Sequence, residues 1–158
     1  MSENARDSVF SRDQETALSG VLDEIIPPSD DGSLPGAGEL GLVRYIEQAV
    51  RRTPELEPVI ARGLAALDVL ASRRDSRDFA ALSKPDKVEV MNELAATEQA
   101  FLPGLIFHTY VGYYLNDRVI EALGREPRPP HPKGYDMEAS DLTLLDDVRR
   151  RPKLYREP

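Results

Sequence analysis

The sequence of 158 residues contains no cysteine and no tryptophan. Without cysteine the chain can form no disulfide, thiolate zinc site or iron–sulfur cluster, and it has no cysteine nucleophile. This absence is compatible with any redox compartment, so it does not indicate a location. A chain of this length suits one domain that buries roughly 70% of its unfolded surface.

Long apolar runs are also missing. A transmembrane helix needs about 20 consecutive apolar residues, whereas the most apolar stretch, 101–115, is shorter and includes His108 and Thr109. Residues 1–13 are polar and net acidic, without the basic start and apolar core of an export signal. We therefore expect no direct membrane insertion and a cytoplasmic protein.

Positive charge is scarce, because 20 Lys and Arg residues face 28 Asp and Glu residues, for a net charge of −8. Nucleic-acid binding needs a positive footprint and is disfavoured. The two histidines, His108 and His131, lack metal-ligand spacing, and no glycine-rich phosphate loop or nucleophile elbow is present. We expect no catalytic, cofactor-binding or metal-ligating residues on this chain.

What the sequence does contain is helical periodicity. Ser11 and Gln14 form a capping-box pattern, and Pro27-Pro28 ends the helix that follows. Thr53 is expected to cap a later helix with Pro54 in its first turn, and Asp117 to cap the last. Helices are predicted over about 11–26, 39–51, 54–74, 84–95, 98–115 and 118–123.

These patterns predict an all-α fold, because no segment alternates polar and β-branched residues. We expect a single helical domain of about five main helices around a central helix, 98–115, which is apolar on nearly every side. The predicted organisation is a flexible N-terminus over 1–9, a helical domain over 10–124, and an extended proline-rich tail with a short helix over 125–158. The tail lacks the apolar area to fold alone, so it is either disordered or laid along another protein.

Four aromatic residues lie within two turns of the predicted central helix: Phe107, Tyr110, Tyr113 and Tyr114. Helical spacing favours a place in the core, whereas the amphipathic character of tyrosine favours a partner surface. Both can hold, since adjacent Tyr113 and Tyr114 point about 100° apart on a helix. One ring can face inward while the other faces outward.

Several short motifs, taken in order, resemble the gluconate 2-dehydrogenase subunit 3 family. The resemblance covers about 10–136, and the order of the motifs carries more weight than any one of them. The matching segments are Phe10-Ser11, 24–28 (EIIPP), 35–38 (PGAG), Tyr45-Ile46, 79–86 (FAALSKPD), 108–114 (HTYVGYY), Asn116-Asp117, Leu123-Gly124 and 132–135 (PKGY).

The resemblance implies a small, cofactor-free subunit of a flavin-dependent sugar or alcohol oxidoreductase. Its partner would be a large flavoprotein of the glucose–methanol–choline type, which holds FAD and performs the hydride chemistry, and a multihaem cytochrome often completes such complexes. Many family members carry a twin-arginine export signal, but here Arg6 and Arg12 stand isolated in acidic sequence. The complex would be periplasmic only if another subunit supplied the signal.

Together these inferences predict a non-catalytic accessory subunit that stabilises or matures the large flavoprotein subunit. The alternative is a free-standing helical interaction module without a redox partner. The residues expected to bind the partner are Tyr113, Tyr114, Pro129, Pro130, Gly134, Tyr135 and Leu145.

Overall fold

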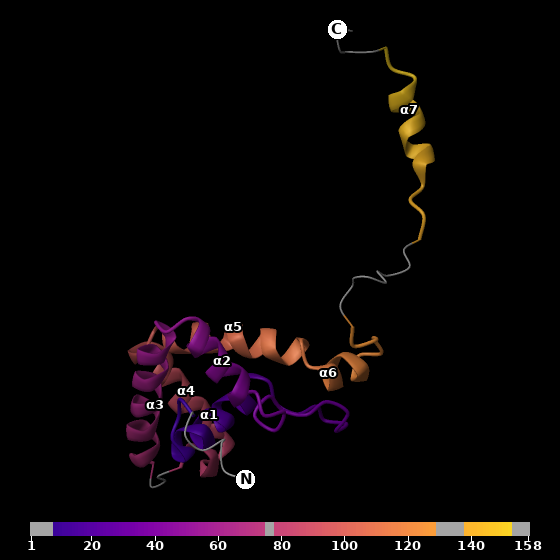
Figure 1. The fold of residues 1–158 in the computed structure, drawn as a ribbon. Helices are drawn as coiled ribbons and strands as arrows, with labels where there is room; N and C mark the ends of the chain where they lie inside the picture. Colours follow the sequence, from indigo (N-terminus) through magenta and orange to yellow (C-terminus); the bar gives the residue numbers. More distant parts are fainter. Residues whose placement is uncertain (1–7, 75–77, 129–137, 153–158) are drawn as a thin grey trace. The chain divides into compact units, whose positions relative to one another are not determined.

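The fold is all-α, as the sequence predicts (Figure 1). The computed structural model describes residues 8–74, 78–128 and 138–152, and no strand occurs among them. The chain divides into two units, 1–127 and 128–158, each of which is described by itself. The expectations for residues 1–7 and 129–137 lie outside the described residues.

The first unit contains six α-helices and one 3-10 turn within its described part. The second unit contains the 3-10 turn η2, Leu142–Leu145, and the short helix α7, Asp146–Arg149. The elements of the first unit are α1 (Arg12–Ile25), α2 (Val43–Arg52), α3 (Leu56–Ser72), η1 (Phe79–Ala81), α4 (Lys84–Thr97), α5 (Phe101–Tyr114) and α6 (Asp117–Ala122).

Two helix starts have a serine side-chain cap, and that of α1 is the predicted capping box. At α1, the Ser11 hydroxyl accepts a hydrogen bond from the Gln14 backbone N–H at 3.3 Å, and the Gln14 side chain accepts one from the Ser11 N–H at 2.9 Å. At α4, the Ser83 hydroxyl accepts from the Asp86 N–H at 3.4 Å. Each cap satisfies a backbone donor that the first turn leaves without a partner.

Three other boundaries were predicted wrongly. Thr53 does not cap α3, which begins at Leu56 after Glu55; instead the Thr53 N–H donates to the carbonyl of Ala49 at 2.9 Å and closes α2. Helix α2 begins at Val43 rather than near residue 39, because turns continue through Gly41, whose φ of +76° suits glycine. The cap of α6 is Asn116 and not Asp117, since the Asn116 side chain accepts from the Arg118 N–H at 3.0 Å.

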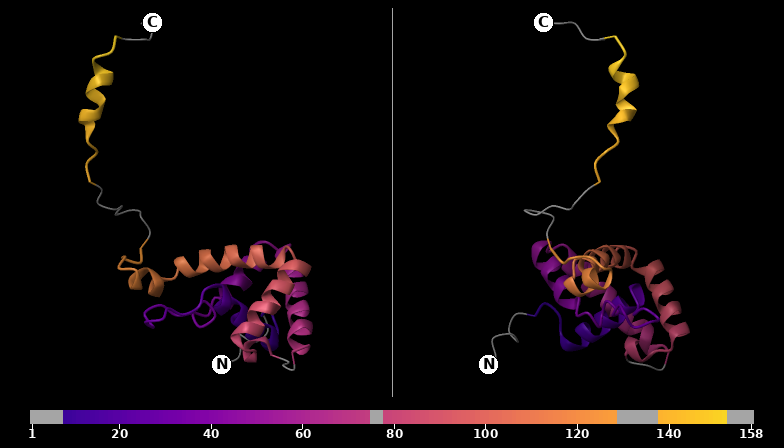
Figure 2. Two further views of the ribbon diagram at one scale, coloured as in Figure 1. Left: turned by 180° about the vertical axis from the view of Figure 1, so that it is seen from behind. Right: turned by 90° about the vertical axis from the view of Figure 1, so that its right-hand side faces the viewer.

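The hydrophobic core lies between α1, α2, α3, α4 and α5 (Figures 1 and 2). Helix α3 packs on α4 and α5, α2 packs on α5, and α1 contacts η1. Gly63 lets α3 approach Phe101 closely, because a Cβ at this position would overlap the aromatic ring. The large side chains that are fully buried are Leu18, Val21, Leu22, Ile46, Leu67, Phe79, Val90, Leu94, Phe101 and Val119.

Helix α5 contacts α1, α2, α3, α4 and α6, so it touches most of the other helices of its unit. Only part of its surface is covered by them. Phe101, Leu105 and Tyr113 are buried, whereas Phe107 and Tyr114 are exposed. The all-round apolar pattern of this helix therefore combines a core face with a second, exposed face.

Two helical glycines test the close approach of α3 to α5. Gly63→Ala should lower the free energy of unfolding by about 1–3 kcal/mol, because the added methyl group would displace the buried Phe101 ring. Gly104→Ala is the matched control: no atom lies within 4 Å of a Cβ there, and alanine favours a helix over glycine by up to about 1 kcal/mol. Urea unfolding followed by circular dichroism measures both, and a Gly63→Ala variant as stable as wild type would contradict this packing.

Candidate interaction surface

One side of α5 forms an uncharged apolar surface, which we call the α5 face: Ile106, Phe107, Tyr110 and Tyr114. Their three- and four-residue spacing places them on the same side of the helix. Each side chain is between 41% and 64% exposed, and α5 contains no Asp, Glu, Lys or Arg. Large exposed apolar patches are unusual on monomeric proteins, so the α5 face is a candidate interaction surface.

Further exposed apolar side chains follow at the carboxyl-terminal end of α5. Leu115 lies directly after the helix, and Leu123 directly after α6. Both are more than half exposed. Figure 1 shows α6 as the direct continuation of the chain beyond α5, so these leucines add apolar surface near that end.

Ring contacts fix the shape of the α5 face. The rings of Tyr110 and Tyr114 have centroids 6.1 Å apart, and those of Tyr113 and Tyr114 meet edge to face at 5.4 Å. Phe107 and half-buried His108 also meet edge to face, at 5.2 Å. These separations lie within the range in which aromatic rings attract one another. The surface is therefore partly ordered before any partner binds.

Tyr113 and Tyr114 point to different sides of α5, as the helical geometry predicts. Tyr114 lies on the exposed side, whereas Tyr113 is only 2% exposed and its hydroxyl donates a hydrogen bond to the backbone carbonyl of Pro35 at 2.9 Å. Burial raises the pKa of the Tyr113 hydroxyl above its usual value of 10.0. The hydroxyl therefore stays protonated at neutral pH and remains a donor.

Pro35 belongs to the loop between α1 and α2, residues 27–42, which we call the clamped loop. In Figure 1 this loop extends away from the other helices and runs below α5 and α6. The Asp23 carboxylate of α1 accepts hydrogen bonds from the backbone N–H groups of Gly38 at 2.7 Å and Glu39 at 3.2 Å. The loop is thus held by α1 at one position and by α5, through Tyr113, at another.

Two glycines of the clamped loop, Gly36 and Gly38, are required by this close contact. A Cβ at Gly36 would overlap the Asp23 carboxylate, and a Cβ at Gly38 would overlap both that carboxylate and the carbonyl of Ser19. A third glycine, Gly112 of α5, lies against the ring of Tyr45 from α2. Three of the short motifs that carry the family resemblance, 35–38, Tyr45-Ile46 and 108–114, are therefore linked by close contacts.

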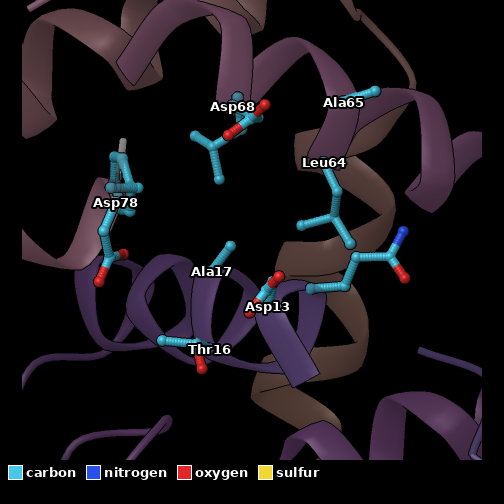
Figure 3. A pocket seen from close by; sticks show the side chains of 10 residues that line it. Asp13, Thr16, Ala17, Leu64, Ala65, Asp68 and Asp78 are labelled. Atoms are coloured by element: carbon cyan, nitrogen blue, oxygen red, sulfur yellow. The ribbon is translucent and has the colours of Figure 1, made fainter. Parts of the chain in front are cut away.

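A hollow lies between α1, α3 and η1, with a volume of about 600 Å³ (Figure 3). Asp13, Asp68 and Asp78 line it, together with apolar side chains such as Leu64 and Ala17. The Asp78 carboxylate also caps η1 by accepting from the Ala80 N–H at 2.9 Å. Sequence reasoning missed this hollow because its walls come from three separate segments.

The hollow offers acidic and apolar contacts without an evident reacting group. Within the described part of the chain, no three His, Cys, Asp or Glu side chains are grouped so that they could hold a metal ion. The lining residues that are described include no histidine, lysine or serine to pair with the carboxylates. The α5 face is therefore the stronger candidate for function.

The predicted partner-binding residues fall into three groups. Tyr114 lies on the α5 face, whereas Tyr113 is buried and holds the clamped loop. Leu145 ends η2 in the second unit, where it is exposed. Pro129, Pro130, Gly134 and Tyr135 lie outside the described residues. Sequence reasoning did not select Asp23 and named Tyr45 only as part of a family motif, because nothing in their local spacing marks these long-range contacts.

The chain is all-α, and its helix α5 carries an exposed aromatic surface without a charged residue. The family described as gluconate 2-dehydrogenase subunit 3 matches residues 12–139, and the chain belongs to this family. The family description names a subunit, so the chain is one component of a complex with other subunits. No curated protein and no solved structure gives a significant match. Among the described residues, no helix has the length and apolar character that crossing a membrane requires.

Removing the Tyr113 hydroxyl tests the clamp on the loop. Tyr113→Phe should lower the free energy of unfolding by about 1–3 kcal/mol, because the buried Pro35 carbonyl loses its donor. Tyr114→Phe, at the neighbouring exposed position, should change it by less than about 0.5 kcal/mol. Urea unfolding of the two variants and of wild type measures the difference, and equal effects of the two substitutions would contradict the clamp.

The same comparison has an expected pH dependence. The unfolded chain ionises the Tyr113 hydroxyl near pH 10, whereas the folded chain keeps it neutral to a higher pH. The unfolded state therefore loses its proton first, and stability falls as pH rises above 10. The advantage of wild type over Tyr113→Phe should be constant at neutral pH and shrink above pH 10.

Proposed function

We propose that this chain is a non-catalytic accessory subunit that stabilises or matures the large subunit of a flavin-dependent sugar or alcohol oxidoreductase. The large subunit would be of the glucose–methanol–choline type and would hold FAD. The observation that carries this proposal is the α5 face, an aromatic surface on a helix without a charged residue.

The composition of the α5 face supports a permanent rather than a transient contact. Aromatic side chains dominate interface energetics, because each buries a large apolar area and loses little rotamer freedom. Each Å² of apolar surface removed from water contributes about 25 cal/mol, before the cost of association. Tyr110 and Tyr114 also keep a hydroxyl for hydrogen bonds to the partner. Obligate interfaces are more apolar than transient ones, as this face is.

The organisation of α5 suits the role of an accessory subunit. Its inner side, with Phe101 and Leu105, is part of the core, and its outer side presents Phe107 and Tyr110. A partner that binds the outer side of α5 would therefore stabilise the helix that contacts most of the others in its unit. The partner would in turn cover the exposed surface, so each subunit would stabilise the other.

Charge substitution on the α5 face tests this function. We expect Phe107→Asp combined with Tyr110→Asp to reduce co-purification of the large flavoprotein subunit, co-expressed from the source genome, by at least tenfold. Two buried carboxylates would have to lose their hydration at the interface, which is costly. Soluble yield and flavin content of the large subunit should fall in parallel.

The control is a second double variant, Val69→Asp with Val88→Asp, which places carboxylates on exposed apolar positions of α3 and α4. It should leave co-purification within about twofold of wild type, and both variants should keep the circular dichroism of the wild-type chain. If the α5 variant retains the large subunit as well as the control does, the α5 face is not the docking surface. If the wild-type chain never retains a flavoprotein, the accessory role itself is refuted in favour of a free-standing interaction module.

A further inference from the structure

The second unit contains a short helical segment, η2 and α7 over 142–149, which together with its flanking residues 141, 150 and 151 we call the tail helix. Its start is capped, because the Asp141 carboxylate accepts hydrogen bonds from the Thr143 backbone N–H at 3.0 Å and from its hydroxyl at 2.6 Å. These bonds lower the pKa of Asp141, so the cap is ionised at neutral pH. The helical conformation is thus favoured by the segment's own side chains.

Ion pairs one turn apart support the same conformation. The Arg149 guanidinium lies 3.2 Å from the Asp146 carboxylate, and that of Arg150 lies 3.3 Å from the Asp147 carboxylate. Both pairs are exposed and each adds little to stability. A helix of this length is marginal by itself in water. It needs buried contacts to be well populated.

The tail helix holds apolar side chains that could make such contacts. Leu142, Leu145 and Val148 recur at three-residue spacing, and Leu144 directly precedes Leu145 in the sequence. These four side chains are between 45% and 79% exposed, and no described residue of the second unit is buried. Anchors at this spacing on a short amphipathic helix are typical of segments that bind an apolar groove on another protein.

Charge along the tail helix has a direction. The first turn of α7 holds Asp146 and Asp147, and the chain continues with Arg149, Arg150 and Arg151. The carboxyl-terminal end of the segment is therefore positive, in a chain whose net charge is −8. A complementary groove would be apolar along its length and would carry acidic side chains where it meets this end.

We propose that the tail helix is a second docking element, which binds an apolar groove with an acidic end on the same large subunit that the α5 face contacts. This inference rests on the proposed function. Two binding surfaces on one chain make the second binding event intramolecular, so together they bind more tightly than either alone. The partner would supply the burial that the second unit lacks among its described residues.

The experiment measures the dissociation constant of the full-length chain for the purified, flavin-loaded large subunit. Leu145→Asp with Val148→Asp should weaken binding by about tenfold to a hundredfold, mainly through faster dissociation. The control Val69→Asp with Val88→Asp should bind within about twofold of wild type. The α5 variant, Phe107→Asp with Tyr110→Asp, reports on the other surface in the same assay.

Charge reversal tests the acidic end of the groove. Arg150→Glu with Arg151→Glu should weaken binding at least threefold, and this loss should diminish as salt is raised. Arg44→Glu with Arg62→Glu changes the net charge equally at exposed positions of α2 and α3 and should have no such effect. Equal losses from both reversals would mean that net charge, and not a groove, is responsible, and would overturn this part of the proposal.

Other results would assign the tail helix elsewhere and overturn the proposal. Wild-type affinity in the Leu145 and Val148 variant, while the α5 variant is weakened, would refute the second docking element and leave the proposed function intact. If the Leu145 and Val148 variant, without the large subunit, sediments differently from wild type, the segment binds a second copy. If the thermal midpoint of this variant alone is lower than that of wild type, the segment packs within its own chain. Failure of the wild-type chain to bind would refute the proposed function instead.

Discussion

The hydrogen bonds that Asp23 and Tyr113 make to the clamped loop determine how the first unit is organised. The backbone from Pro35 to Gly38 is buried, and buried N–H and C=O groups are costly without partners. Asp23 accepts from the Gly38 N–H and from that of exposed Glu39, the Ile26 carbonyl accepts from the Ala37 N–H at 2.9 Å, and the Tyr113 hydroxyl donates to the Pro35 carbonyl. Because Asp23 lies on α1 and Tyr113 on α5, the loop joins these helices, and the rotation of α5 about its own axis is fixed.

The rotation of α5 decides which of its apolar side chains reach water. Tyr113 must point toward the clamped loop, and Gly112 must face the ring of Tyr45, so the helix cannot turn without breaking both contacts. Tyr114 is thereby directed outward with Phe107. An exposed aromatic surface weakens solubility and invites aggregation, and a packed helix could bury it by turning. The clamp prevents this, which favours a surface kept for another subunit.

The local parts of this fold were predictable from the sequence, and the long-range parts were not. The capping box at Ser11 and the stop at Pro27-Pro28 depend on neighbours along the chain, and the structure confirms them. Thr53 was misassigned because Thr-Pro is typical of a helix start, whereas here a turn at 54–55 delays α3 to Leu56 and the Thr53 backbone N–H closes α2. The exposed side of α5 could not be identified, because no polar stripe marks it. The pairing of Tyr113 with Pro35 spans 78 residues, beyond any local pattern.

The two units differ in how far their apolar side chains are buried. The first has a core large enough to order its helices, and its described residues include the exposed apolar side of α5. The second has a capped helical segment whose leucines, among the described residues, are all exposed. The α5 face consists of only a few side chains on one helix, whereas obligate interfaces commonly bury more than about 2,000 Å² in total. An additional segment that orders on the partner adds area without requiring a larger core, although part of its binding energy offsets the loss of conformational freedom. In the proposed complex, the α5 face would orient the chain and the tail helix would add affinity, because both surfaces belong to the same chain.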